Sequence, residues 1–509
     1  MLRKIPPILW LVVPLAYVLY VYGLGSVGIL GVDEPRYASV AREMAQSGDW
    51  VTPRLWGQPW FEKPALSYWM TAAGFRAGLP PDWAPRLPVA LLAIGFLAFY
   101  RWMLGREFGC RAAWMATLIL GTTGIWLGYS QVGVTDLPLA ATFSAAMLLC
   151  LPWVGREDPR YLPAAAAMLG LATLAKGLVA VVLALPLLWW MRSRRPPARV
   201  VVGSVAAFLA VALPWYGLCY WRNGWPFIED FIVKQHFARV TSGSLMHVQP
   251  WWFYLKWAPA LLLPWTPLLM LFGRQAAWRD PRRQFLLAVA LFGLAAFSAA
   301  LNKLPGYILP IVPAVGALTG VVLDEAAKRG AARPLLAGCG LVLVAFPVAA
   351  AVLPDALAHG LSHVTRPRFE AAWLLAAAPA LAALALDRRG KRLAAVAAVA
   401  AGVGAGVFYL KAKAAPELNE SVSARGLWSH IAAHAGDVCV DGIDRSWRYG
   451  LNYYSVQPIP DCGEAPTPWW LRQEPGQRPR LVPAPPAIGS AGHAVDPLSW
   501  KVVTSGLRN

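Results

Sequence analysis

Long runs of apolar residues, each about as long as a membrane span, follow one another along most of the chain. A helix needs roughly 20 apolar residues to cross the hydrocarbon core of a bilayer, with a range of about 17–25. These runs predict a polytopic α-helical membrane protein with about 13 transmembrane helices. The expected spans are residues 5–24, 85–104, 112–128, 136–154, 161–175, 177–191, 200–220, 255–272, 284–301, 307–323, 334–353, 370–386 and 393–410.

Polar stretches divide this apolar series into a membrane domain at 1–410 and a small C-terminal domain at 411–509. The membrane domain carries two long loops, 25–84 and 221–254. No A-x-A-like site follows the first apolar run, so we expect it to be a retained helix and not a cleaved signal peptide. Strand-like runs in the C-terminal domain favour a small mixed α/β module; they are Asp437–Ile443, Leu451–Val456 and Lys501–Thr504.

Composition and charge support a membrane protein. The chain is 57% hydrophobic and 14% charged, whereas soluble proteins carry about a quarter charged residues. This excludes a soluble enzyme, a disordered chain and a secreted disulfide scaffold. The net charge of +19 comes from short Lys and Arg clusters on alternate connections, so no nucleic acid is expected as a partner. The positive-inside rule places these clusters in the cytoplasm and the two long loops and the C-terminal domain outside. In that outer compartment Cys439 and Cys462 can form a disulfide.

The first long loop opens with an amphipathic helix at the membrane surface. In GVDEPRYASVAREMAQSGDW, apolar side chains recur at helical spacing from Tyr37 to Met44, and Gly48 gives a stop signal. Asp33 and Glu34 stand at the helix start. Asp33 is a candidate functional carboxylate, and the alternative is that it only caps the helix.

Further charged residues occur away from the cytoplasmic clusters. Lys63 lies among aromatic residues, where it could hold a phosphate or simply snorkel to the membrane surface. Asp136 begins a span. Lys176 interrupts an apolar region, where a bare ammonium is costly and needs an anion, a turn rich in carbonyls, or water. Lys303 and Tyr307 share another external turn.

The second long loop adds His236, Arg239 and His247. His236 and Arg239 are three residues apart and would share one face of a helix. Glu62 with the two histidines could form a metal site, although their spacing matches no recognised ligand pattern. Together, acids, cations and many tryptophans on one membrane face suit a lipid-phosphate-linked substrate. Cations there would stabilise charge on a phosphate leaving group, and a carboxylate would act as general base on an acceptor hydroxyl.

Several motifs resemble those of the bacterial 4-amino-4-deoxy-L-arabinose (aminoarabinose) transferases, which belong with the protein O-mannosyltransferases in the GT-C superfamily of membrane glycosyltransferases. They are DEPRYASVAREMAQSGDW, FEKP at 61–64, TDLPL at 135–139, LAKG at 174–177 and KLPGYILP at 303–310. The motifs cover about residues 1–325, and the rest of the chain agrees mainly in layout. Trp60 departs from the family, which often has Tyr before FEKP, and this puts one lipid-phosphate contact in doubt.

The resemblance implies a membrane enzyme with its active site and C-terminus in the periplasm of the bacterial inner membrane. A polyprenyl (undecaprenyl) phosphate sugar would be the donor, lipid A or another periplasmic molecule the acceptor, and the anomeric centre would invert. The implied roles follow the matching motifs: Asp33 as catalytic carboxylate with Glu34 completing the acidic pair; Lys63, Arg239 and Tyr307 on the lipid phosphate; Asp136 and Lys176 in or near the cavity; Glu62 and His236 at a structural divalent metal such as zinc. From the residues alone, Lys303 is a further candidate for substrate binding and His247 for the metal.

Two other functions fit the sequence. A protein O-glycosyltransferase would use the same donor class on a different acceptor. A transporter or flippase for a lipid-linked substrate would use Lys176 along its path, but it predicts internal symmetry between two halves, which the sequence does not show.

The charge pattern generates a topology prediction. We expect reporter fusions after residues 195, 280, 331 and 390 to report the cytoplasm, because each lies within a basic connection. Fusions after residues 75, 240 and 420 are expected to report the outside. An external signal at 195 or 280 would contradict the orientation and move every candidate site residue to the other side of the membrane.

Overall fold

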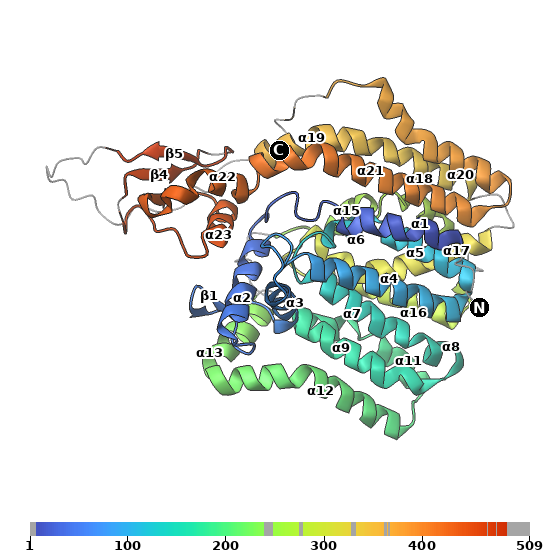
Figure 1. The fold of residues 1–509 in the computed structure, drawn as a ribbon. Helices are drawn as coiled ribbons and strands as arrows, with labels where there is room; N and C mark the ends of the chain where they lie inside the picture. Colours follow the sequence, from blue (N-terminus) through green and yellow to red (C-terminus); the bar gives the residue numbers. More distant parts are fainter. Residues whose placement is uncertain are drawn as a thin grey trace, which may run out of the picture.

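The computed structural model describes residues 7–238, 248–273, 278–326, 332–360, 364, 367–465, 467–474 and 476–485, and these are mostly helical (Figure 1). Within them, eight helical runs are long and apolar enough to cross a membrane, or nine if one bent pair forms a single span. The predicted helical membrane fold is thereby confirmed.

The eight long runs coincide with predicted spans. They are α4 (Leu87–Phe108), α7 (Asp136–Leu149) continuing into α8 (Leu151–Arg156), α12 (Ala198–Asn223), α16 (Pro281–Ala299), η6 (Pro305–Ile311) with α17 (Val312–Glu325), α18 (Arg333–Leu341) through η8 (Val342–Val344) to α19 (Ala345–His359), η10 (Ala371–Ala377) with α20 (Ala378–Arg388), and α21 (Arg392–Ser421).

The other five predicted spans form shorter or broken helices. For example, the helix over 110–129 breaks at Thr122 and Thr123, whose hydroxyls donate to carbonyls one turn back, while the N–H of Gly124 donates to Leu263. The five comprise α1 (Pro7–Ala16) with η1 (Tyr17–Val21); α5 (Cys110–Gly121) with α6 (Gly124–Tyr129); α9 (Leu162–Lys176), preceded by η2 (Pro159–Tyr161); α10 (Val179–Leu183) with α11 (Leu187–Ser193); and α15 (Phe253–Leu261) with η4 (Thr266–Gly273), bent by 114°.

The helix α7 forms the centre of the membrane domain. Its span is entirely buried and packs against α4 and α9, whereas α12 lies at the outer edge, packs against α9 and has few buried residues (Figure 1). Elsewhere small residues allow close packing: a Cβ on Gly320 of α17 would lie 2.5 Å from the backbone nitrogen of Ala116 in α5. Close approach of this kind is typical of helices that pack without a hydrophobic driving force.

The predicted amphipathic helix is present as α2 (Asp33–Ser47), and it ends at Gly48 with φ of 74°. Its buried stripe, which includes Val40 and Met44, packs on α3 (Ala65–Arg76). Between the two helices, β1 (Arg54–Leu55) and β2 (Gln58–Pro59) pair antiparallel as a hairpin. In the second long loop, α13 (Trp225–Phe227) leads into η3 (Ile228–Ala238).

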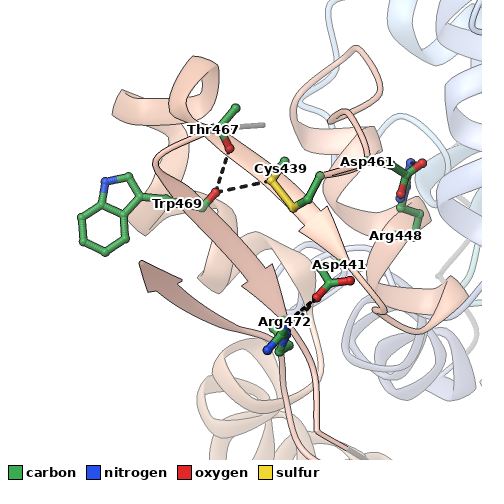
Figure 2. Close-up of a disulfide and its surroundings, with 8 residues drawn as sticks. Cys439, Asp441, Arg448, Asp461, Thr467, Trp469 and Arg472 are labelled. Atoms are coloured by element: carbon green, nitrogen blue, oxygen red, sulfur yellow. Dashed lines mark hydrogen bonds and ion pairs between the residues drawn. A yellow bond between two sulfur atoms is a disulfide. The ribbon is translucent and has the colours of Figure 1, made fainter. Parts of the chain in front are cut away.

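Beyond α21 the chain forms a small α/β module, which we call the C-terminal module (residues 422–485). Its sheet has the order β3–β4–β5, with a parallel and then an antiparallel pair, and the disulfide Cys439–Cys462 fixes β3 to the following segment (Figure 2). Its elements are α22 (Ala424–Ile431), η11 (Ala432–Asp437), β3 (Val438–Asp441), α23 (Arg445–Tyr454), β4 (Trp469–Arg472) and β5 (Arg480–Pro483).

One predicted strand of this module is wrong. Residues 451–454 of the predicted strand Leu451–Val456 belong to α23, because Trp447, Leu451 and Tyr454 recur at helical spacing and pack together against β3. The predicted strand Asp437–Ile443 is confirmed as β3. The third, Lys501–Thr504, lies outside the described residues.

The C-terminal module is docked on the loop between the first two predicted spans, at the end of the membrane domain where α2 lies (Figure 1). Asp82 is the central acceptor: Arg425 and the hydroxyl of Tyr454 donate to its two oxygens at 2.7 and 2.6 Å. The Tyr454 hydroxyl in turn accepts from the N–H of Ile29 at 2.8 Å. The side chain of Asp82 is only 14% exposed, so these bonds are largely shielded from water.

We expect Asp82→Ala to loosen the module, because it leaves the Tyr454 hydroxyl without its acceptor, at a cost of about 1–3 kcal/mol, and removes the ion pair with Arg425. Limited proteolysis of the detergent-solubilised protein should release the module faster than from wild type. Asp441→Ala is the matched control, since it removes a more exposed ion pair with Arg472 inside the module (Figure 2), worth about 0–1 kcal/mol. Equal release from both variants would contradict the role of Asp82.

Candidate functional site

A cavity of about 1020 Å³ opens where α2, the 60–63 segment, α6, α7, the end of α9 and η6 meet. Most of the predicted site residues that the structure describes line it, and its wall carries both cations and acids. The charged residues of its wall are Asp33, Glu34, Arg36, Glu62, Lys63, Asp136, Lys176 and Arg445.

Asp33 presents its carboxylate to this cavity. Its side chain is 52% exposed, and Oδ1 accepts from Nη2 of Arg36 at 2.5 Å. The residue that precedes α2 is Val32, and no side chain caps the helix N-terminus. The capping alternative for Asp33 is therefore wrong, since its carboxylate is directed to an arginine one turn along.

Glu34, the next residue, has different surroundings. It is 2% exposed and holds Arg86 through two hydrogen bonds of 2.8 Å. It also accepts from the N–H groups of Gly133 at 2.8 Å and Leu30 at 3.1 Å. Glu34 thus lines the cavity with both oxygens already occupied by protein donors.

Arg36 links Asp33 to the FEKP segment. Its Nη2 lies 3.0 Å from Oε2 of Glu62, and Nζ of Lys63 lies 3.1 Å from Oε1 of the same carboxylate. Burial lowers the pKa of Arg36, but the negative charges of Glu62 and Asp33 outweigh this and raise it above its usual value. Arg36 therefore stays charged and fixes the position of both acids.

Lys176 and Asp136 form a second charged pair, on the part of the wall made by α7, α9 and η6. Lys176 ends α9, and its Nζ lies 2.6 Å from Oδ1 of Asp136 at the start of α7. The same ammonium lies 4.7 Å from the ring centroid of Tyr307 in η6, a distance suited to a cation–π interaction. The anion that an ammonium at this position requires is thus Asp136.

Lys303 has a different place from the other candidates. It does not line the cavity; its Nζ donates to the carbonyls of Gln249 at 2.7 Å and Ala300 at 2.5 Å. Burial lowers its pKa. The geometry ties two segments of backbone together and directs Lys303 away from the cavity.

The structure describes only some of the remaining candidates, which are the predicted metal ligands and Arg239. Arg239 and His247 lie outside the described residues, and of His236 only the backbone, in η3, is described. Glu62, the third predicted ligand, contacts the two cations Arg36 and Lys63. Among the described residues no three His, Cys, Asp or Glu side chains are grouped to hold a metal ion. The metal site stays a prediction.

Arg36, Tyr129 and Arg445 are among the cavity residues that sequence reasoning missed. The position of Arg36, one helical turn after Asp33, is a signal that could have found it. Tyr129 follows a helix break, and Arg445 comes from the distant C-terminal module, so no local pattern links either residue to the cavity.

This arrangement, with helical spans below and a charged cavity at the end where a small α/β module docks, is a fold of the GT-C type. A family model described as dolichyl-phosphate-mannose-protein mannosyltransferase matches residues 62–217. The crystal structure of ArnT from Cupriavidus metallidurans bound to undecaprenyl phosphate is similar with a TM-score of 0.71 and 27% identity, covering 89% of this chain and 85% of that one.

Sequence relatives agree with the structural likeness. The chain is 32% identical to undecaprenyl phosphate-α-4-amino-4-deoxy-L-arabinose arabinosyl transferase 2 of Pseudomonas fluorescens, over 60% of this chain and 54% of the relative. It is 32% identical to the transferase of that name from Pseudomonas aeruginosa, over 64% and 62%. The matches thus span less than two thirds of these relatives' lengths. The predicted resemblance to the aminoarabinose transferases is confirmed.

Gly306, between the cavity residues Tyr129 and Tyr307, generates a prediction. A Cβ at this position would lie 1.6 Å from the hydroxyl oxygen of Tyr129, so Gly306→Ala must displace that ring. We expect a loss of about 1–3 kcal/mol from overpacking, measured as a lower unfolding temperature in detergent. Gly128→Ala is the matched control, because it lines the same cavity and its Cβ would meet no atom within 4 Å. Partial recovery in Gly306→Ala with Tyr129→Ala would identify the clash as the cause.

Proposed function

We propose that this multi-span membrane protein is an inverting glycosyltransferase, which moves a sugar from a polyprenyl (undecaprenyl) phosphate donor to a lipid A-type or other periplasmic acceptor. The observation that carries the proposal is the carboxylate of Asp33, half exposed to a large cavity whose other walls hold cations. The relatives named as transferases of an undecaprenyl-phosphate sugar, and the ArnT structure bound to undecaprenyl phosphate, support the donor class.

Asp33 acts as the general base in this mechanism. It removes the proton from the attacking oxygen of the acceptor, either a hydroxyl or a protonated phosphate oxygen, as that oxygen bonds to the anomeric carbon. Arg36 at 2.5 Å holds the carboxylate in place. Attack opposite the leaving phosphate breaks the glycosyl–oxygen bond and inverts the anomeric centre.

The cations of the cavity serve the leaving group. A lipid phosphate leaves with its negative charge, so no acid has to protonate it, and fixed positive charges stabilise that anion as it forms. Lys63 and Lys176 lie on the cavity wall within two separate ion pairs. Tyr307, next to the Lys176 ammonium, takes part in the same subsite, and Arg239 is proposed to join it from the second long loop.

Glu34 has a positioning role in this proposal. Both of its oxygens are engaged by Arg86 and backbone N–H groups, so it lacks a free edge with which to accept a proton. It fixes the start of α2, which places Asp33 at the cavity.

Two closely related candidate functions differ only in the acceptor. The likeness to the aminoarabinose transferases favours a lipid A-type acceptor. The family model for protein mannosyltransferases, matched over residues 62–217, favours a protein hydroxyl as the second candidate. A mass increase on lipid A phosphates in cells that express the protein would distinguish them. Either reaction would place the protein in the bacterial inner membrane with this cavity facing the periplasm.

Asp33→Asn is the decisive variant. Asn keeps the size and hydrogen-bonding edge of Asp but cannot take the proton, so we expect turnover to fall by about a hundredfold or more. Donor binding and thermal stability should be retained, since Arg36 keeps its second partner Glu62. Glu43→Gln on the same helix is the matched control; its carboxylate accepts from the N–H of Gly57 and lies outside the cavity. Turnover of Asp33→Asn within a few-fold of wild type would contradict the catalytic role.

A further inference from the structure

Arg445 differs from the other cations of the cavity wall in having no acidic partner among the described residues. Arg36 pairs with Asp33 and Glu62, Lys63 pairs with Glu62, and Lys176 pairs with Asp136. Arg445 is exposed, and its guanidinium carbon lies 6.0 Å from the centroid of the Tyr449 ring. Within the described part of the chain, Arg445 thus contributes the positive charge that the cavity's own acids do not balance.

The helix that carries Arg445 is held firmly against the cavity mouth. Tyr449, one turn along α23, stacks on Trp56 with ring centroids 5.7 Å apart and an interplanar angle of 16°. Trp56 has φ of 52°, a left-handed conformation that a bulky residue adopts only where its surroundings enforce it. The Tyr449 ring also contacts Arg36, whose guanidinium carbon lies 5.5 Å from the ring centroid.

These contacts place Arg445 on the Asp33 side of the cavity. Tyr449 packs on Arg36, and Arg36 holds Asp33, so α23 and the proposed base belong to one continuous cluster. The pair Lys176–Asp136 and Tyr307 lie on the wall formed by α7, α9 and η6. A base must lie beside the attacking oxygen, and Lys63 and Lys176 are already assigned to the donor phosphate. The remaining cation of the wall, Arg445, is therefore assigned to the acceptor.

We propose that Arg445, supplied by the C-terminal module, binds an anionic phosphate on the acceptor and so orients the attacking oxygen toward Asp33. The inference rests on the proposed glycosyl transfer and assigns its acceptor side. An exposed guanidinium without a carboxylate partner keeps its N–H fork available, and that fork matches a phosphate through two parallel hydrogen bonds. The C-terminal module thereby supplies part of the substrate site as well as covering it.

The first test is binding of purified lipid A, with both phosphates, to the full-length protein in detergent without donor. We expect Arg445→Ala to weaken binding about tenfold and Arg445→Lys to weaken it about threefold, because an ammonium keeps the charge but loses the fork. Arg480→Ala is the matched control: Arg480 is an exposed arginine of the same module, in β5, outside the cavity wall, and its removal should leave binding unchanged. Dephosphorylated lipid A should bind wild type and Arg445→Ala equally weakly.

The second test is steady-state transfer from undecaprenyl-phosphate aminoarabinose. Arg445→Ala should raise the KM for lipid A about tenfold and also lower kcat, because the bound acceptor is no longer oriented toward Asp33. The donor KM should stay within about twofold of wild type, with an unchanged unfolding temperature. A raised donor KM with an unchanged acceptor KM, or equal lipid A binding by wild type and Arg445→Ala, would overturn the assignment. Wild-type protein that binds lipid A through Arg445 but transfers no sugar would instead contradict the proposed function and leave the binding site standing.

Discussion

The buried ion pair between Glu34 and Arg86 is the interaction on which the site depends. Both side chains are less than 5% exposed, and two hydrogen bonds of 2.8 Å join them. The remaining N–H groups of Arg86 donate to the carbonyls of Leu24, Val27 and Gly28, while Glu34 also accepts from Gly133. One pair therefore fixes the first loop, the start of α4 and the entry to α7. Removal of either partner would leave an uncompensated buried charge, at a cost of about 3–5 kcal/mol.

This anchor explains how two adjacent acids come to have different surroundings. Because Glu34 is turned into the protein toward Arg86, Asp33 at the preceding helical position is turned about 100° away and reaches the cavity. The same anchor supports the docking of the C-terminal module, since the segment held by Arg86 also donates from Gly28 to Asn419 and from Ile29 to Tyr454. Asp33, the first loop and α23 are thus parts of one hydrogen-bonded unit.

The sequence predicted much of this fold because membrane spans are encoded locally. A run such as 136–154 needs only its own apolar residues to be recognised, and it forms α7 and α8. Helix breaks depend on distant partners, as at Gly124, whose N–H donates to Leu263. The sequence therefore predicted one unbroken span over 112–128, where the structure has the two helices α5 and α6. The candidate residues in motifs were found for the same local reason. Arg86 and Arg445 were missed because their importance lies in contacts across the chain, which no spacing reveals.

The charges of the cavity are arranged so that an anionic substrate can enter without reorganising the wall. A cavity of unpaired lysines would itself be destabilising, since each ammonium would lie desolvated among like charges. Here Lys176 is held by Asp136 and Lys63 by Glu62, so each of these cations is fixed in place before substrate arrives. Preorganised charge of this kind stabilises a leaving group at little cost at the moment of reaction. Arg445 belongs to the C-terminal module and adds a positive charge to the cavity wall beyond those of the ion pairs.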